Sequence, residues 1–154
     1  MLSKYRNYII SVLIAFGAGA LGGLVTFMGM EGYESVSKPA LTPPPVVFSI
    51  VWPILFLLMG IGAALIFKSK SPKRSNALFI YAVQLGMDFI WCVLFFGFGL
   101  YLASFIWLVL LWFAVLLMII SFFNINKAAG LIQIPYLIWL TFAAYLNLMI
   151  WILN

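Results

Sequence analysis

One carboxyl group stands out in this sequence, because Asp88 is the only acidic or basic side chain inside a long apolar run. Helical spacing places it on one stripe with Gln84, Trp91 and Phe95. A carboxyl group at such a position must face protein, water or a partner, which makes Asp88 a functional candidate. The alternative is a structural Asp88 that hydrogen-bonds a neighbouring helix, through Gln84 or Asn147. Since the apolar runs hold no lysine or arginine, we expect a neutral Asp88.

The residue inventory excludes several kinds of chemistry. The chain has no histidine, which is the usual axial haem ligand, the commonest metal ligand and the commonest general base. Its single cysteine, Cys92, excludes an internal disulfide and any multi-cysteine metal site. We find no nucleophile–base pair and no nucleotide-binding loop. The sequence therefore predicts neither a metal site nor a resident cofactor.

Aromatic side chains recur at helical spacing in two other runs. One run carries Phe48, Trp52 and Phe56. A broad face of the last run is formed by Pro135, Tyr136, Trp139, Phe142, Ala143, Leu146 and Asn147. Such stripes are usually packing surfaces, and tryptophan often lies at a membrane interface. Trp52 and Trp139 differ, because each lies near a proline that disturbs the backbone. The alternative to simple packing is a pocket that takes flat, apolar ligands.

A proline-rich stretch precedes the first of these runs. Pro39, Pro43, Pro44 and Pro45 fix φ and lack an N–H, so they predict a stiff, extended connection. Pro44 or Pro45 suits the first turn of a helix, where the missing donor is not needed. Pro53 lies inside the apolar run, where it should bend the helix beside Trp52. The stretch thus predicts a rigid wall and lid for a pocket.

The overall composition identifies an integral membrane protein. Of 154 residues 67% are hydrophobic and 7% charged, and the mean hydropathy is +1.23. A soluble domain of this size could not bury so much apolar surface. The runs are long and uninterrupted, which indicates helices rather than a β-barrel. We predict an all-α, five-transmembrane-helix bundle forming one domain, 1–154, with spans at about 8–28, 46–67, 76–98, 102–123 and 131–153 and a pocket-capping loop at 29–45.

Charge and small residues add two expectations about arrangement. Five spans place on one side the basic residues Lys4, Arg6, Lys68, Lys70, Lys73, Arg74 and Lys127. The other side has only Lys38, so we expect a cytoplasmic N-terminus and an outward loop 29–45. Ala15, Gly19 and Gly23 recur every four residues in the first span, which permits close helix contact either within the chain or between protomers.

Three blocks of residues carry a resemblance that spans nearly the whole chain. The first holds Lys38-Pro39, Pro43-Pro44, Phe48, Trp52 and Met59-Gly60. The second holds Gln84-Leu85, Trp91 and Phe95-Phe96-Gly97. The third holds Pro135-Tyr136-Leu137, Trp139-Leu140, Phe142-Ala143, Leu146-Asn147 and Trp151. With these blocks the sequence resembles the tryptophan-rich sensory protein / translocator protein family (TspO/MBR, the peripheral benzodiazepine receptor type).

The resemblance implies a membrane receptor, usually a homodimer, whose first loop closes a pocket. Its implied ligands are protoporphyrin IX and other tetrapyrroles, cholesterol, and drugs of the benzodiazepine or isoquinoline carboxamide type. Protoporphyrin would be a ligand or substrate, not a resident cofactor. The family is also linked to light-dependent porphyrin breakdown, for which Trp52 and Trp139 are the candidate catalytic electron donors. The expected ligand-binding residues are Tyr33, Lys38, Pro43, Phe48, Trp52, Phe56, Gln84, Asp88, Trp91, Phe95, Trp139, Phe142, Ala143, Leu146 and Asn147.

This chain departs from the family pattern at three places. Asp88 stands where the family usually has asparagine, so ligand hydrogen bonding can differ or depend on pH. The aromatic pair of the first loop is reduced to Gly32-Tyr33. No lysine or arginine follows Asn147, so the tyrosine-then-basic cholesterol pattern is absent and we do not expect tight cholesterol binding.

These observations leave several functions open. The leading one is a receptor for planar apolar ligands in the cell membrane of a bacterium, with no nucleic-acid partner. Lys38 either meets porphyrin propionates or extends to the membrane edge. Photo-oxidative porphyrin degradation would make the protein an enzyme, whereas a proton-coupled carrier would use Asp88. The absence of inverted repeats argues against a carrier. A passive scaffold would use the face of Ala15 and Gly23.

Overall fold

A computed structural model describes residues 2–154 of the chain, and over these residues it contains helices and no strand. The elements are α1 (Leu2–Met28), α2 (Met30–Ser35), α3 (Pro45–Phe67), α4 (Arg74–Cys92), the π-helix η1 (Val93–Gly97), α5 (Tyr101–Ile125), α6 (Lys127–Leu131) and α7 (Ile134–Leu153). Five segments are long and apolar enough to span a membrane, namely Tyr5–Met28, Pro45–Phe67, Arg74–Gly97, Tyr101–Ile125 and Lys127–Leu153. The all-α, five-span prediction is confirmed.

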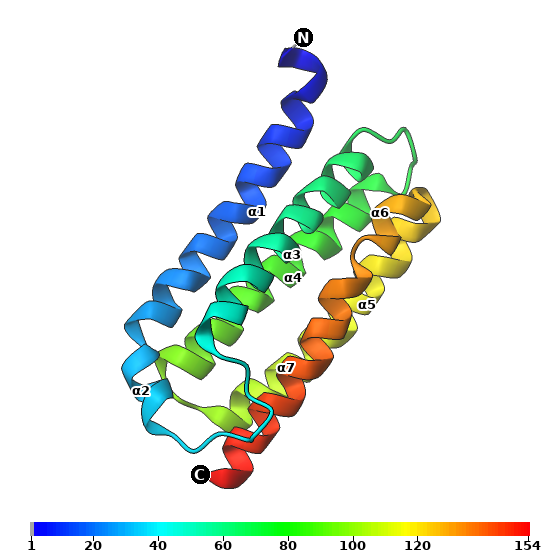
Figure 1. The fold of residues 1–154 in the computed structure, drawn as a ribbon. Coiled ribbons are helices and arrows are strands. Elements are labelled where there is room, and N and C mark those ends of the chain that lie inside the picture. Colours follow the sequence, from blue (N-terminus) through cyan, green and yellow to red (C-terminus); the bar gives the residue numbers. More distant parts are fainter. Residues whose placement is uncertain (1) are drawn as a thin grey trace.

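The long helices form an elongated bundle (Figure 1). Helix α1 packs mainly on α3 and also on α4, while α5 packs on both α4 and α7. By contrast, the backbones of α3 and α7 make little direct contact. Aromatic side chains of α3 and α7 meet across this space, and the site described below is formed there.

Small residues determine how closely α1 approaches α3. Ala15 is fully buried, and a side chain at Gly19 would meet the ring of Phe56. Similarly, a side chain at Gly60 would meet the backbone of Val12. At Gly23, by contrast, a Cβ atom would have no atom of a neighbouring element within 4 Å. Two members of the predicted small-residue stripe thus serve packing within the chain, and the third is open.

Helix α5 supplies the centre of the core. Leu108, Leu111, Val115, Met118 and Phe122 are fully buried and recur every three or four residues, which is the period of one helix face. Because α5 touches both α4 and α7, this face joins the two helices that carry most of the buried polar residues.

Prolines and a glycine mark two of the boundaries between elements. Pro45 is the first residue of α3 and the extended Pro44 precedes it, as predicted, while Pro53 lies inside the helix. Gly99, with φ of 63°, turns the chain between η1 and α5. The sequence did not predict the short helix α2, the π-helix η1, or the division of the fifth span into α6 and α7.

Candidate ligand-binding site

Aromatic rings of α3 and α7 meet across the gap between these helices. We call the group of Phe48, Trp52 and Phe56 with Tyr136, Trp139 and Phe142 the α3–α7 aromatic cluster. The centroids of the Trp52 and Trp139 rings are 6.5 Å apart with an interplanar angle of 89°. Trp139 also lies 5.6 Å from Phe48 and 5.7 Å from Phe142. The structure therefore brings together the two tryptophans that the sequence singled out, in the edge-to-face geometry that aromatic pairs favour.

The remaining predicted rings form a second group around η1. Trp91 stacks on Phe95 with centroids 5.2 Å apart, and Tyr33 of α2 lies 5.8 Å from the Phe95 ring and 5.4 Å from Phe96. Tyr101 at the start of α5 lies 5.0 Å from Phe95. These contacts hold α2, and with it the first connection, against the end of the third span.

Asn147 joins three elements through buried hydrogen bonds. Its Oδ1 accepts from Trp91 Nε1 and from Ser104 Oγ, both at 3.1 Å, and its Nδ2 donates to the carbonyl of Tyr101 at 2.8 Å. Both lone pairs of Oδ1 are thereby engaged. Asn147 and Trp91, which the sequence placed among the ligand-binding residues, are thus parts of a polar network that positions the walls of the site.

Gln84 has a similar positioning role. The Tyr136 hydroxyl donates to Gln84 Oε1 at 2.8 Å, and Gln84 Nε2 lies 3.7 Å from Met59 Sδ. The Gln84 side chain is fully buried. It fixes the orientation of the Tyr136 ring, which lies 6.5 Å from Trp52 in the aromatic cluster. Helical spacing placed Tyr136 on the correct face of α7, but Tyr136 was not among the predicted ligand-binding residues.

Among the described residues, five buried side-chain polar atoms have no hydrogen-bond partner, and three of them belong to residues near the aromatic cluster or in the first connection. These three are Asp88 Oδ1, Trp139 Nε1 and Thr42 Oγ1. Asp88 is 6% exposed, and neither Gln84 nor Asn147 engages its Oδ1. Unpartnered buried polar atoms are few in native proteins, and each calls for an explanation such as an absent ligand or water. The site thus offers an acceptor at Asp88 and a donor at Trp139.

The first connection is stabilised by Lys38. Its Nζ donates to the carbonyls of Glu34 at 3.3 Å and Val36 at 3.1 Å, and it lies 4.7 Å from the centroid of the Tyr33 ring. Burial raises the pKa of the Tyr33 hydroxyl and nearby Tyr101 adds to the increase, so Tyr33 is neutral at physiological pH. The Lys38 ammonium group retains a third donor that these two bonds do not use.

The same connection is tied to the far end of the chain. The backbone N–H of Ser37 donates to Asn154 Oδ1 at 3.0 Å, and Asn154 Nδ2 donates to the Ser37 carbonyl at 2.9 Å. Figure 1 shows the connection running from α2 to the end of α7 before it returns to α3. We call this pair of bonds the Ser37–Asn154 latch. The latch could not be predicted from the sequence, because no local pattern indicates which loop meets Asn154.

Other predicted residues complete the walls. Ala143 and Leu146 are buried in α7, while Pro43 is partly buried in the connection. Among the described residues, 2–154, no three histidine, cysteine, aspartate or glutamate side chains gather as metal ligands would. The arrangement suits a flat apolar molecule that stacks on rings and makes a few hydrogen bonds.

Comparison with known proteins gives a consistent result. The sequence profile described as the TspO/MBR family matches residues 10–152. Protein CrtK of Rhodobacter capsulatus is 34% identical over 155 residues, covering 99% of this chain and 94% of the relative. Tryptophan-rich protein TspO of Chlorobaculum tepidum is 36% identical, covering 79% of this chain and 78% of the relative. Translocator protein of Sus scrofa is 31% identical, covering 80% and 75% respectively.

Proposed function

The chain belongs to the TspO/MBR family, and from this premise we propose that it is a membrane receptor for tetrapyrroles, protoporphyrin IX first. Drug-like apolar ligands of the benzodiazepine or isoquinoline carboxamide type are the proposed second class. The ligand would lie in the α3–α7 aromatic cluster beneath the first connection. The observation that carries this proposal is the pair of unpartnered buried atoms, Asp88 Oδ1 and Trp139 Nε1, together with the edge-to-face contact between the Trp52 and Trp139 rings.

The chemistry of a porphyrin matches these features. Its macrocycle is a flat apolar surface that can stack on one of the perpendicular Trp52 and Trp139 rings and meet the edge of the other. Its pyrrole N–H groups are donors for Asp88, and its propionates are partners for the remaining donor of Lys38 at the mouth. Since the chain has no histidine, a metal-free porphyrin fits this site better than haem.

The experiment is a protoporphyrin titration of purified protein in detergent, followed by quenching of tryptophan fluorescence in the dark. We expect saturable binding by wild type and weaker binding by a Trp52→Phe, Trp139→Phe double variant. Trp151→Phe is the matched control, because Trp151 is 44% exposed near the end of α7. Binding that never saturates, or that the double variant leaves unchanged, contradicts the proposal.

A photochemical activity is favoured by one further observation, the contact between Trp52 and Trp139. We propose that an indole gives one electron to the photoexcited porphyrin, leaving an indole radical cation and a porphyrin radical anion. Dissolved oxygen would be the oxidant for ring opening. Illumination should then remove the porphyrin spectrum in wild type but not in the double variant. Persistence of the spectrum in both proteins under light and oxygen excludes this activity.

The alternative is a carrier in which Asp88 exchanges a proton as the ligand moves. Asp88 lies within the third candidate span, and its Oδ1 has no partner. An Asp88→Asn variant in vesicles separates the two functions. If binding and uptake are both unchanged in this variant, Asp88 does not drive transport and the carrier function loses its support. If binding is unchanged but pH-driven uptake is lost, the carrier function is supported.

We also propose that the protein is a homodimer in the membrane. The open position at Gly23 and the exposed side chains of Leu21, Leu24 and Phe27 offer α1 as the contact face. Crosslinking between Gly23→Cys protomers in native membranes, in a Cys92→Ser background, tests this. Crosslinking no stronger than that of the exposed control Ala103→Cys on α5 contradicts it.

A further inference from the structure

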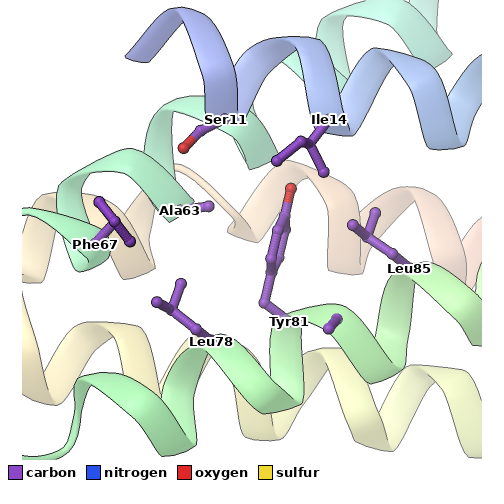
Figure 2. Close-up of a pocket in the computed structure, with 8 residues that line it drawn as sticks. Ser11, Ile14, Ala63, Phe67, Leu78, Tyr81 and Leu85 are labelled. Atoms are coloured by element: carbon purple, nitrogen blue, oxygen red, sulfur yellow. The ribbon is translucent and has the colours of Figure 1, made fainter. Parts of the chain in front are cut away.

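A separate cavity lies between α1, α3 and α4, close to the turn that joins α3 and α4 (Figure 2). Its volume is about 220 Å³. The lining comes from residues such as Ser11 and Ile14 of α1, Ala63 and Phe67 of α3, and Tyr81 and Ala82 of α4. None of these residues belongs to the α3–α7 aromatic cluster. We call this cavity the α1–α4 pocket.

The lining of the α1–α4 pocket includes a buried hydroxyl group with no partner. Tyr81 is 7% exposed, and its hydroxyl oxygen is buried without a hydrogen bond. In Figure 2 the Tyr81 ring points from α4 towards α1, and its oxygen lies near Ile14. Buried tyrosine hydroxyls usually find a hydrogen-bond partner, so this one indicates a missing acceptor.

The pocket is open to the lipid rather than to water. Ile14 is 57% exposed and Phe67 is 50% exposed, and both lie in candidate membrane spans, as does the exposed Ala82. No charged residue is among the described side chains that line the cavity. A charged group would therefore find no compensating partner there, so the occupant is neutral and enters from the bilayer.

We propose that the α1–α4 pocket binds a neutral, membrane-soluble carbonyl compound, whose oxygen accepts a hydrogen bond from Tyr81 and whose apolar body fills the cavity. An apolar cavity of about 150 Å³ can hold a benzene ring, so the α1–α4 pocket accommodates a somewhat larger body. Any tail leaves between α1 and α4 into the lipid. An acyl chain alone would fill the volume but leave the Tyr81 hydroxyl unpartnered.

This inference stands apart from the proposed tetrapyrrole function and has its own probe. Benzophenone is a neutral ketone, and near-ultraviolet light makes its carbonyl insert into nearby C–H bonds. Purified protein is illuminated at increasing benzophenone concentrations, and the adducts are located by mass spectrometry. We expect saturable labelling of the segments 11–14 and 78–85. Adducts confined to 48–56 and 136–142 would overturn the inference, although they would support a ligand site at the aromatic cluster.

Two variants and one control test the proposed contact between the benzophenone carbonyl and Tyr81. Tyr81→Phe keeps the ring but removes the donor, and should raise the half-saturating concentration by about tenfold. Ala82→Phe fills the open side and should abolish saturable labelling. Ala103→Phe, at an exposed position on α5, should have no effect. Labelling that Ala82→Phe blocks but Tyr81→Phe leaves unchanged indicates a site for lipid chains and overturns the carbonyl assignment.

The melting temperature without benzophenone checks whether the hydroxyl is simply structural. Tyr81→Phe removes a hydroxyl that has no protein partner, so its melting temperature should equal or exceed that of wild type. A clearly lower melting temperature would mean that Tyr81 bonds within the protein, and would overturn the inference.

Discussion

The sequence predicted the helix faces of the buried polar residues but not their hydrogen-bond partners, as Asp88, Gln84 and Asn147 show. Helical spacing correctly placed Gln84 and Asn147 on buried faces, where Asp88 also lies. It could not show which helix each side chain meets. Asn147 bonds Trp91 and Ser104, Gln84 bonds Tyr136, and Asp88 Oδ1 has no partner. Periodicity determines a face, whereas pairing depends on how the faces dock.

At this scale we predict that Asn147→Ala destabilises the protein. The substitution leaves Trp91 Nε1 without its acceptor and removes the donor to the Tyr101 carbonyl, whereas Ser104 Oγ keeps that carbonyl as an acceptor. The free energy of unfolding should fall by about 1–3 kcal/mol, seen as a lower melting temperature by circular dichroism in detergent. The control is Asn124→Ala, at an exposed position in α5. Equal melting temperatures for the two variants would show that the network does not contribute to stability.

At the scale of elements, the apolar runs predicted the five spans to within a few residues at most ends. The division of the fifth span into α6 and α7 escaped prediction because it depends on a distant contact. Gln133 Nε2 donates to the carbonyl of Leu58 at 2.9 Å, and it lies where a side chain at Gly62 would otherwise be. Similarly, α2 is held by the rings around η1 and not by any signal of its own.

The Ser37–Asn154 latch gives an element-scale prediction. Asn154→Leu removes both hydrogen bonds that tie the connection to α7. Because we propose that the connection closes the site, bound protoporphyrin should dissociate about tenfold faster from this variant. Stopped-flow displacement measures this rate, and the exposed Asn124→Leu provides the control. A dissociation rate equal to that of wild type means that the latch does not limit ligand exit.

At the scale of the whole molecule, the bias of basic residues predicts the orientation in the membrane. The turn between α3 and α4 and the start of α6 hold Lys68, Lys70, Lys73, Arg74 and Lys127, while the opposite end holds Lys38. Ser75, at the start of α4, and Glu31 of α2 are exposed positions near the two ends. In a Cys92→Ser background, an impermeant maleimide applied to intact cells should label Glu31→Cys but not Ser75→Cys. Labelling of Ser75→Cys alone would show that the protein has the opposite orientation in the membrane.

We propose that the ligand binds beneath the first connection, between α3 and α7. Hydrogen–deuterium exchange with and without saturating protoporphyrin tests this location directly. Exchange of the amides of residues 36–42 should slow by about tenfold or more, because the ligand stabilises the closed connection, and exchange in the turn 68–73 should not change. Saturable binding that leaves the exchange of residues 36–42 unchanged, or that slows exchange in the turn instead, would show that the ligand binds elsewhere.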